Sequence, residues 1–355
     1  YDASGNCLGL LVEEARTNLL QYSEDFSNSY WQKDDVSVTA NAALAPDGTQ
    51  TADLVLDNTA NSRHIVFRSY PSSSSHAVSI FMKDAGRRYA GLCIHGGGST
   101  TTGIVDLQEG IITDNSGASL LEIKHIGNGW YRVSTVRGLT DYVVISLSNT
   151  DSNDGVLEHG SPQYSGNGSD GIYLWGAQLE QGSFPTSYIP TSGSTVTRAA
   201  DVASLAVSEF GYNQNQGTVV VSGHYSGLGS SATSGVFELN QAVSAPNGVE
   251  LRLHGASSSL MGYDNNDAFL SGGGNVPVNS DFKIALGFVV GSTNAAASYN
   301  GSVTNAFASV DVNTVASIEL FKHDVNLGRI LNGHLKSVQY YPLRLSNAQL
   351  QALTV

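Results

Sequence analysis

The chain has 355 residues, enough for two domains that each bury a core, and only 14% of them are charged, against roughly 25% in an average soluble protein. Its net charge of −14 argues against nucleic acid as a partner, because phosphate binding needs concentrated Lys and Arg. The same charge disfavours anionic membranes, and no apolar run reaches the roughly 18 residues of a spanning segment, so we expect no membrane partner either.

The first residues begin in mid-motif, without an initiator Met or a signal peptide. Residues 1–15 are therefore predicted to be the N-terminal segment of a longer chain. The two cysteines, Cys7 and Cys93, are too few for a disulfide framework. Because Cys93 lies in an apolar run, we predict a buried free thiol there.

Residues 16–192 are predicted to form a first sandwich or jelly roll. Short apolar or alternating runs, separated by Gly, Asn, Asp and Pro turns, indicate strands of five to seven residues. The strand candidates are 76–82, 89–94, 130–136, 142–147 and 172–175. The last of these is apolar on both faces, so it is predicted to be buried on both sides.

The prolines and Ser/Thr/Gly content that follow Phe184 mark an exit from this domain, and residues 193–215 are predicted to be a linker. The strand pattern restarts at Gly217, which gives a second sandwich over 216–355. In Val249–His254, strict alternation predicts one buried and one open face. A capping box at Ser346–Gln349 predicts one short helix. The fold class is therefore all-β, with two β-sandwich (jelly-roll) domains and one short C-terminal helix.

Aromatic side chains are the first candidates for a binding site, because sugar rings stack on them. Tyr30 and Trp31 lie in a polar, loop-like stretch, and they are predicted to contact a glycan. Trp130 follows a tight Gly-Asn-Gly turn inside a strand pattern, so it is predicted to belong to the core. Solvated or core positions remain the alternative for all of them.

A second candidate glycan site combines a strand end with the following loop. It consists of His254, Tyr263, Asp264 and Asn265. Asp, Asn and an aromatic ring are frequent sugar ligands in concanavalin-like folds. Solvated loop residues are the alternative interpretation.

Calcium is the one metal that the sequence suggests. Asp151, Asp154 and Asp170 offer hard oxygen ligands for a structural ion, although their spacing is not that of an EF-hand. No His/Cys cluster has zinc spacing. No pair of carboxylates matches the Glu-x-Asp-x-x-Glu strand of concanavalin-like glucanases, and no Gly-x-Ser-x-Gly motif stands between a strand and a helix. We therefore predict no catalytic residues.

Several blocks within residues 9–202 carry a family resemblance. They are Gly9–Leu20, Tyr22–Phe26 with Trp31, Ala45–Thr49, Gly129–Val133, Trp175–Glu180 and Phe184–Thr191. In this order they resemble a signature of phage and prophage tail or spike proteins, and the region is also similar to jelly-roll carbohydrate-binding modules. Near the chain end, Gly333–Pro342 and Arg344–Leu350 resemble the last strand and helix of concanavalin A-like (laminin G-type) sandwiches.

The resemblance implies a tail-fibre, spike or decoration protein at the virion surface, outside the cell. Its implied partners are host cell-surface polysaccharide and other virion proteins, and repeated weak sugar sites favour a homo-oligomer, with a trimer preferred. We predict a non-catalytic glycan-binding protein. Two alternatives stay open: a tail-borne polysaccharide depolymerase (a lyase or a glycoside hydrolase), and a purely structural spacer or oligomerisation module.

Overall fold

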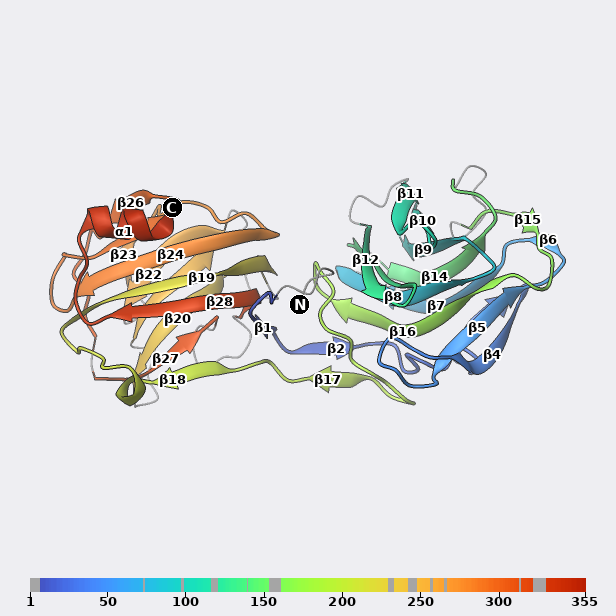
Figure 1. Ribbon diagram of the computed structural model, residues 1–355, viewed down its shortest axis with the longest axis horizontal. Coiled ribbons are helices and arrows are strands. Elements are labelled where there is room, and N and C mark those ends of the chain that lie inside the picture. The colour runs from blue at the N-terminus through green and yellow to red at the C-terminus, as the bar shows by residue number, and fades with distance from the viewer. Residues whose placement is uncertain are drawn as a thin grey trace. The chain divides into compact units, whose positions relative to one another are not determined.

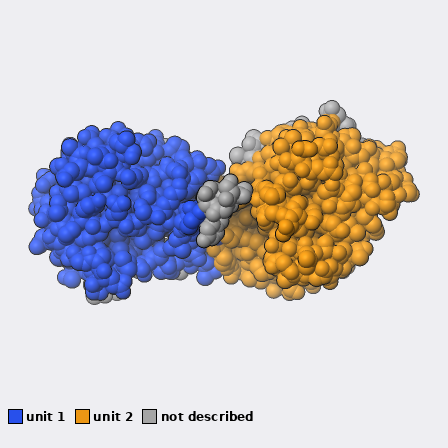
Figure 2. Space-filling model, viewed as in Figure 1, with its two compact units in different colours: residues 1–15, 199–355 blue, residues 16–198 orange. Residues whose placement is uncertain are grey.

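The computed structural model describes residues 7–72, 74–96, 99–115, 121–138, 140–152, 161–228, 233–241, 248–255, 258–264, 267–312, 314–321 and 330–355. The chain is nearly all β-strand with one short α-helix at its C-terminal end, which confirms the predicted fold class (Figure 1). It divides into two compact units, residues 16–198 and residues 1–15 with 199–355 (Figure 2). Among the described residues, no helix has the length and apolar character needed to cross a membrane.

The described residues of the unit 16–198 form two six-stranded antiparallel sheets. One sheet has the order β11 (Ile111–Asp114), β10 (Ser99–Asp106), β9 (Tyr89–Gly96), β14 (Thr140–Ser148), β7 (Ile65–Ser72) and β3 (Gln32–Asp34). The other has the order β12 (Glu122–Gly127), β13 (Trp130–Arg137), β8 (His76–Ala85), β16 (Gly171–Gln181), β5 (Ala52–Asp57) and β4 (Val36–Ala43). Two small pairs complete the unit: β2 (Arg16–Asn18) with β17 (Val196–Arg198), and β6 (Asn61–Ser62) with β15 (Tyr164–Ser165).

The core of this unit lies between the two sheets, because alternate residues of each strand point inward. On β9, Leu92 and Ile94 face the core, and on β8 Val78 and Ile80 do the same. Cys93 points to the opposite face of β9, where it is fully buried and outside any disulfide, as predicted. In β16, Ile172 and Leu174 belong to this core while Trp175 is buried on the other side, so the strand is covered on both faces.

The other unit also contains two six-stranded antiparallel sheets. One has the order β1 (Leu10–Val12), β28 (Leu331–Tyr341), β19 (Gln216–Leu228), β24 (Ser280–Val289), β25 (Ala296–Tyr299) and β26 (Ser302–Asn305). The second has the order β18 (Ala203–Ala206), β27 (Val315–Leu320), β20 (Thr233–Gln241), β21 (Val249–His254), β22 (Ser259–Asp264) and β23 (Asp267–Leu270). A short 3-10 helix, Val207–Glu209, follows β18.

Strand β21 corrects the prediction of an open face. Val249, Leu251 and Leu253 point into the core, as the alternation predicts. Glu250 and Arg252, on the other face, are buried as well, because they form an ion pair with each other. The Arg252 guanidinium also lies 4.1 Å from the centre of the Tyr263 ring. Pairing of opposite charges allows polar residues to be buried where alternation alone indicates exposure.

Helix α1 (Asn347–Thr354) covers the outer face of the first sheet of this unit. Its predicted capping box is present: the Gln349 amide donates to the Ser346 hydroxyl at 3.3 Å, and the Ser346 amide donates to the Gln349 side chain at 2.8 Å. Leu350 is fully buried against Val220 and Ala285 of the sheet. The helix therefore covers a small apolar cluster on the outer face of this sheet.

Residues 7–15 and 193–215 contribute strands to the units. β1 pairs with β28, so the N-terminal segment adds an edge strand to the C-terminal unit. Part of the stretch expected as a linker is divided between the units, since β17 pairs with β2 and β18 pairs with β27.

Candidate functional site

The aromatic pair predicted as a glycan site divides between core and surface. Trp31 is 1% exposed, packs on Phe26 with ring centroids 5.1 Å apart, and donates from Nε1 to the Tyr22 carbonyl at 2.8 Å. The prediction that Trp31 contacts a ligand is wrong, because the polar residues around it in sequence form the outside of a loop whose centre is this indole. Tyr30 is half-buried, and the Arg68 guanidinium lies 3.9 Å from its ring centre.

Trp130 belongs to the core, as predicted. It is 2% exposed, and its Nε1 donates to the Leu44 carbonyl at 3.1 Å. It lies in a second apolar cluster of this unit, together with Phe81 and Trp175. Like Trp175, whose Nε1 donates to the Thr51 hydroxyl at 2.9 Å, Trp31 and Trp130 are buried with a bonded Nε1, so they stabilise the fold and are hidden from any ligand.

The residues of the second predicted site are not brought together. His254 is exposed and pairs with Ser259, whereas Tyr263 pairs with Glu250, four register positions or about 14 Å away along the strands. Asp264 points to the inner side of β22, is 6% exposed, and accepts from the Asp311 amide. A buried carboxylate that holds a backbone amide is a structural group, which corrects its assignment to a glycan surface. Asn265 lies outside the described residues.

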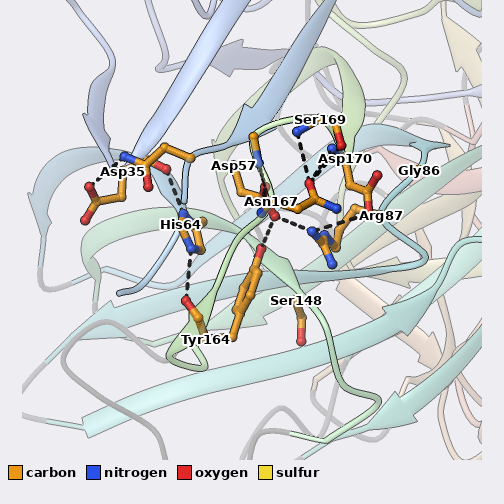
Figure 3. A network of polar contacts seen from close by, with 12 residues as sticks. Asp35, Asp57, His64, Gly86, Arg87, Ser148, Tyr164, Asn167, Ser169 and Asp170 are labelled. Carbon is orange, nitrogen blue, oxygen red and sulfur yellow. Dashed lines mark hydrogen bonds and ion pairs between the residues drawn. The ribbon is translucent and has the colours of Figure 1, made fainter. Parts of the chain in front are cut away.

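One of the predicted calcium ligands, Asp170, lies next to a buried polar network (Figure 3). The Asp57 side chain has no exposed surface, and it accepts from the Tyr164 hydroxyl at 3.0 Å, from the Asn167 amide at 3.1 Å and from Arg87. The same Arg87 guanidinium lies 3.6 Å from the Asp170 carboxylate, so a cation already neutralises that candidate ligand.

The other two candidate ligands are Asp151, which closely follows β14, and Asp154. Asp151 is exposed, and Asp154 falls outside the described residues. In the described part of the chain, no three His, Cys, Asp or Glu side chains are placed so that all three could bind one metal ion. Calcium therefore remains a prediction.

A pocket of about 290 Å³ lies where two distant segments of this unit meet. Its lining residues are Tyr22, Glu24, Asp25, Pro190, Thr191 and Ser192. The Tyr22 and Tyr30 rings are 5.5 Å apart, which places the pocket next to the predicted aromatic pair. Its volume is near the lower end of ligand pockets, about 300–1,000 Å³, so it fits one small ligand or the end of a longer one.

A buried asparagine fixes the two segments of the pocket relative to one another. The Asn18 amide nitrogen donates to the carbonyls of Ala177 and Ile189 at 3.1 and 2.9 Å. Its side-chain oxygen accepts from the amides of Leu20 and Leu179, each at 3.2 Å. All hydrogen-bonding groups of one buried side chain are thus satisfied, which makes the arrangement rigid.

Further hydrogen bonds connect the segments at the pocket itself. The Thr191 amide donates to the Ser23 hydroxyl at 2.8 Å, and the Ser23 amide donates to the Thr191 carbonyl at 3.3 Å. The Tyr188 hydroxyl contacts the Ser23 hydroxyl at 2.6 Å and donates to Glu24 at 2.8 Å. Burial raises the pKa of Tyr188, so its hydroxyl stays a donor and positions the Glu24 carboxylate.

The acidic loop of the pocket is held by a lysine beneath it. The Asp25 carboxylate accepts from the Ser27 hydroxyl at 2.6 Å and from the Asn28 amide at 3.0 Å. The three protons of the Lys33 ammonium are directed to the carbonyls of Ser27, Asn28 and Trp31, at 3.1, 2.8 and 3.0 Å. Burial lowers the pKa of Lys33, and the charge of Asp25 partly offsets this. Asp25 therefore stays in a fixed place at the pocket wall.

This arrangement combines an aromatic ring with fixed hydrogen-bond acceptors. A half-buried tyrosine ring offers an apolar face, and two carboxylates accept hydrogen bonds from hydroxyl or ammonium groups. The pocket could not be predicted directly from the sequence, because its two halves are more than 160 residues apart. One signal was present: Tyr22–Phe26 and Phe184–Thr191 are two of the blocks that carry the family resemblance, and residues of both line the pocket.

The comparisons with known proteins give only remote structural similarities. No protein-family model matches the chain, and no curated protein sequence is significantly similar to it. The CBM40 of the Ruminococcus gnavus IT-sialidase is 15% identical, with a TM-score of 0.34 over 43% of this chain and 93% of that chain. A heptameric SAP-like pentraxin from Limulus polyphemus is 13% identical, with a TM-score of 0.32 over 40% and 70%. Domains LG4-5 of the mouse laminin alpha1 chain are 10% identical, with a TM-score of 0.27 over 95% and 92%.

Proposed function

We propose that the protein binds a glycan in the pocket lined by Tyr22, Glu24 and Asp25. The observation that carries this proposal is the combination, in one pocket of about 290 Å³, of a tyrosine ring with two positioned carboxylates. Sugars present apolar C–H faces and many hydroxyl donors, and this pair of features is complementary to both.

The charge of the pocket supports one class of sugar as the ligand. Among the described residues that line it, two are carboxylates and none is Lys or Arg. An anionic sugar would be repelled, since like charges in a partly desolvated site are unfavourable. We therefore propose a neutral or amino-bearing sugar on the host cell surface as the ligand, with uronic and sialic acids excluded.

Binding without cleavage is the proposed mode. Both carboxylates are already engaged by donors of the protein, Glu24 by the Tyr188 hydroxyl and Asp25 by Ser27 and Asn28. The rival function, a polysaccharide depolymerase, is favoured by the presence of two carboxylates in one sugar-sized pocket, as glycoside hydrolysis requires. Incubation with host polysaccharide separates the two: new reducing ends or unsaturated sugars would favour the depolymerase.

The biological setting that we propose is the surface of a phage particle, in a tail fibre, spike or decoration protein that is a homo-oligomer, with a trimer preferred. The ordered sequence blocks over residues 9–202 support this setting. Oligomers raise the avidity of weak single sites. A structural spacer without a ligand is the other possibility, and it differs by showing no glycan binding.

A glycan array probed with the wild-type chain and with Tyr22→Ala and Glu24→Gln tests the proposal. We expect binding to neutral or amino sugars, and loss of that signal in both variants. Tyr142→Ala, a half-buried tyrosine on the outer face of β14, is the matched control and should keep the wild-type pattern. A signal that all three variants retain would place the ligand elsewhere, and a wild-type signal only on anionic glycans would overturn the proposed ligand class.

A further inference from the structure

A row of polar side chains crosses the outer face of the first sheet in the unit that contains residues 199–355. Three of its members lie directly opposite one another on adjacent strands: His334 on β28, His224 on β19 and Asp281 on β24. The His224 and His334 ring centroids are 6.5 Å apart. The site is open to solvent, since the side chains of His224 and Asp281 are 33% and 64% exposed.

The carboxylate selects one tautomer of the central histidine. The Nδ1 of His224 lies 3.0 Å from Asp281 Oδ1, and a carboxylate only accepts. Nδ1 therefore carries the proton, and the lone pair of the neutral ring is on Nε2. A carboxylate behind a histidine whose other nitrogen is left to bind is the arrangement that orients metal-ligating histidines in proteins.

The backbone around His224 and His334 departs from regular strand pairing. The pairing of β19 with β28 shifts register between Ser222 and Gly223, and again between Tyr225 and Gly227, so two irregularities flank His224. A Cβ on Gly333 would lie 1.9 Å from the His224 carbonyl oxygen, so the glycine is needed beside the pair. Bulges of this kind re-aim side chains near functional positions.

We propose that His224 and His334 bind one late transition-metal ion, such as Zn²⁺ or Ni²⁺, with Asp281 as the positioning residue. Imidazole nitrogens suit these ions, whereas Ca²⁺ and Mg²⁺ require oxygen ligands. Two imidazoles on one tetrahedral ion, with metal–nitrogen distances of about 2.0–2.1 Å, have centroids about 5 Å apart. The two rings must therefore approach by rotation of their half-buried side chains, from 6.5 Å in the unbound protein. One ring nitrogen of His334 suffices, and water completes the coordination.

A substitution of Lys336 should change the affinity for the metal in the opposite direction to a substitution of either histidine. Its ammonium lies 2.5 Å from Asp281 Oδ2, so it places a positive charge beside the ion and competes for the carboxylate. Removing that charge should strengthen metal binding, whereas removing either histidine should weaken it. A general loss of structure cannot produce both effects.

Isothermal titration of the untagged full chain with Zn²⁺ and with Ni²⁺ tests the site. We expect one ion per chain, at least a tenfold loss of affinity in His224→Gln and in His334→Gln, about a tenfold loss in Asp281→Asn, and a gain in Lys336→Gln. His254→Gln, which removes an exposed histidine of the same unit, is the control and should bind as wild type. Absence of binding in the wild type, or affinities unchanged by both histidine variants, would overturn the proposal.

Discussion

At the scale of single residues, aromatic side chains of one loop have opposite roles. Trp31 is enclosed and its Nε1 is bonded, whereas Tyr22 forms part of a pocket wall. The sequence places both in the same polar stretch, and nothing in their neighbours distinguishes them. The loop that carries Trp31 is held by hydrogen bonds from the Lys33 ammonium to the carbonyls of Asn28 and Trp31. Contacts of a side chain with the backbone leave no periodic pattern in the sequence, so the burial of Trp31 could not be predicted.

Replacing Trp31 by Ala should destabilise the unit of residues 16–198 by about 3–5 kcal/mol, because a buried indole is lost and a cavity remains. Tyr22→Ala should cost less, because its ring is half-buried. Chemical denaturation of both variants measures the difference in the free energy of unfolding. A Trp31→Ala protein as stable as the wild type would contradict the assignment of Trp31 to the core.

Buried His76 should make stability depend on pH. It is 2% exposed, and burial lowers its pKa from the ordinary value of 6.5, although the bond of Nδ1 to the Ser74 carbonyl opposes this. The folded protein therefore takes up a proton less readily than the unfolded chain. The corresponding stability is complete above the unfolded pKa and is lost as the pH falls below it.

Between about pH 7.5 and pH 5.5, a range that spans the ordinary histidine pKa, we expect the melting temperature of the wild type to fall further than that of His76→Gln. His254→Gln, at an exposed histidine, should follow the wild type. Parallel curves for the wild type and His76→Gln would show that burial of this imidazole has no such effect.

At the scale of elements, local patterns predicted strands and one helix well, because alternation and capping chemistry act within a few residues. The capping box at Ser346 and the buried thiol of Cys93 are examples. Strand partners were not predictable in this way. The pairing of β2 with β17 joins residues about 180 positions apart, and the burial of Glu250 depends on Arg252 and on the neighbouring strand.

Loss of the helix cap should be small but measurable. Ser346→Ala removes the acceptor for the Gln349 amide and should lower the free energy of unfolding by about 1 kcal/mol. Gln351→Ala, an exposed position of the same helix, is the control and should be close to neutral. An equal effect of the two substitutions would mean that the cap contributes nothing specific.

At the scale of the whole molecule, each unit has its own core, and in each unit the pairing of strands joins segments that are far apart in the sequence. The strand pair β2 and β17 joins the beginning and the end of residues 16–198. In the other unit, β1 contributes an edge strand, and the Glu14 amide donates to the Asn332 side chain at 2.8 Å. A fragment that begins at residue 199 therefore lacks the edge strand β1 of its unit. A fragment of residues 16–198 keeps every strand of the other unit.

We expect the fragment 16–198 to fold with a cooperative transition, whereas 199–355 alone should melt at a lower temperature than the same unit in the full chain. Circular dichroism during heating measures both. A fragment 199–355 as stable as the unit in the full chain would show that the pairing of β1 with β28 adds nothing.

The central claim is that the pocket at Tyr22 binds a glycan. Titration of the best neutral or amino sugar from the array, with the wild type, Tyr22→Ala and Tyr263→Ala, tests it most directly. Loss of one stacking ring should weaken binding by roughly 1–3 kcal/mol, or about 5- to 150-fold in Kd, by analogy with bases stacked on aromatic rings. We predict this loss for Tyr22→Ala and wild-type affinity for Tyr263→Ala. The reverse result, with Tyr263→Ala weakened and Tyr22→Ala unchanged, would contradict the account.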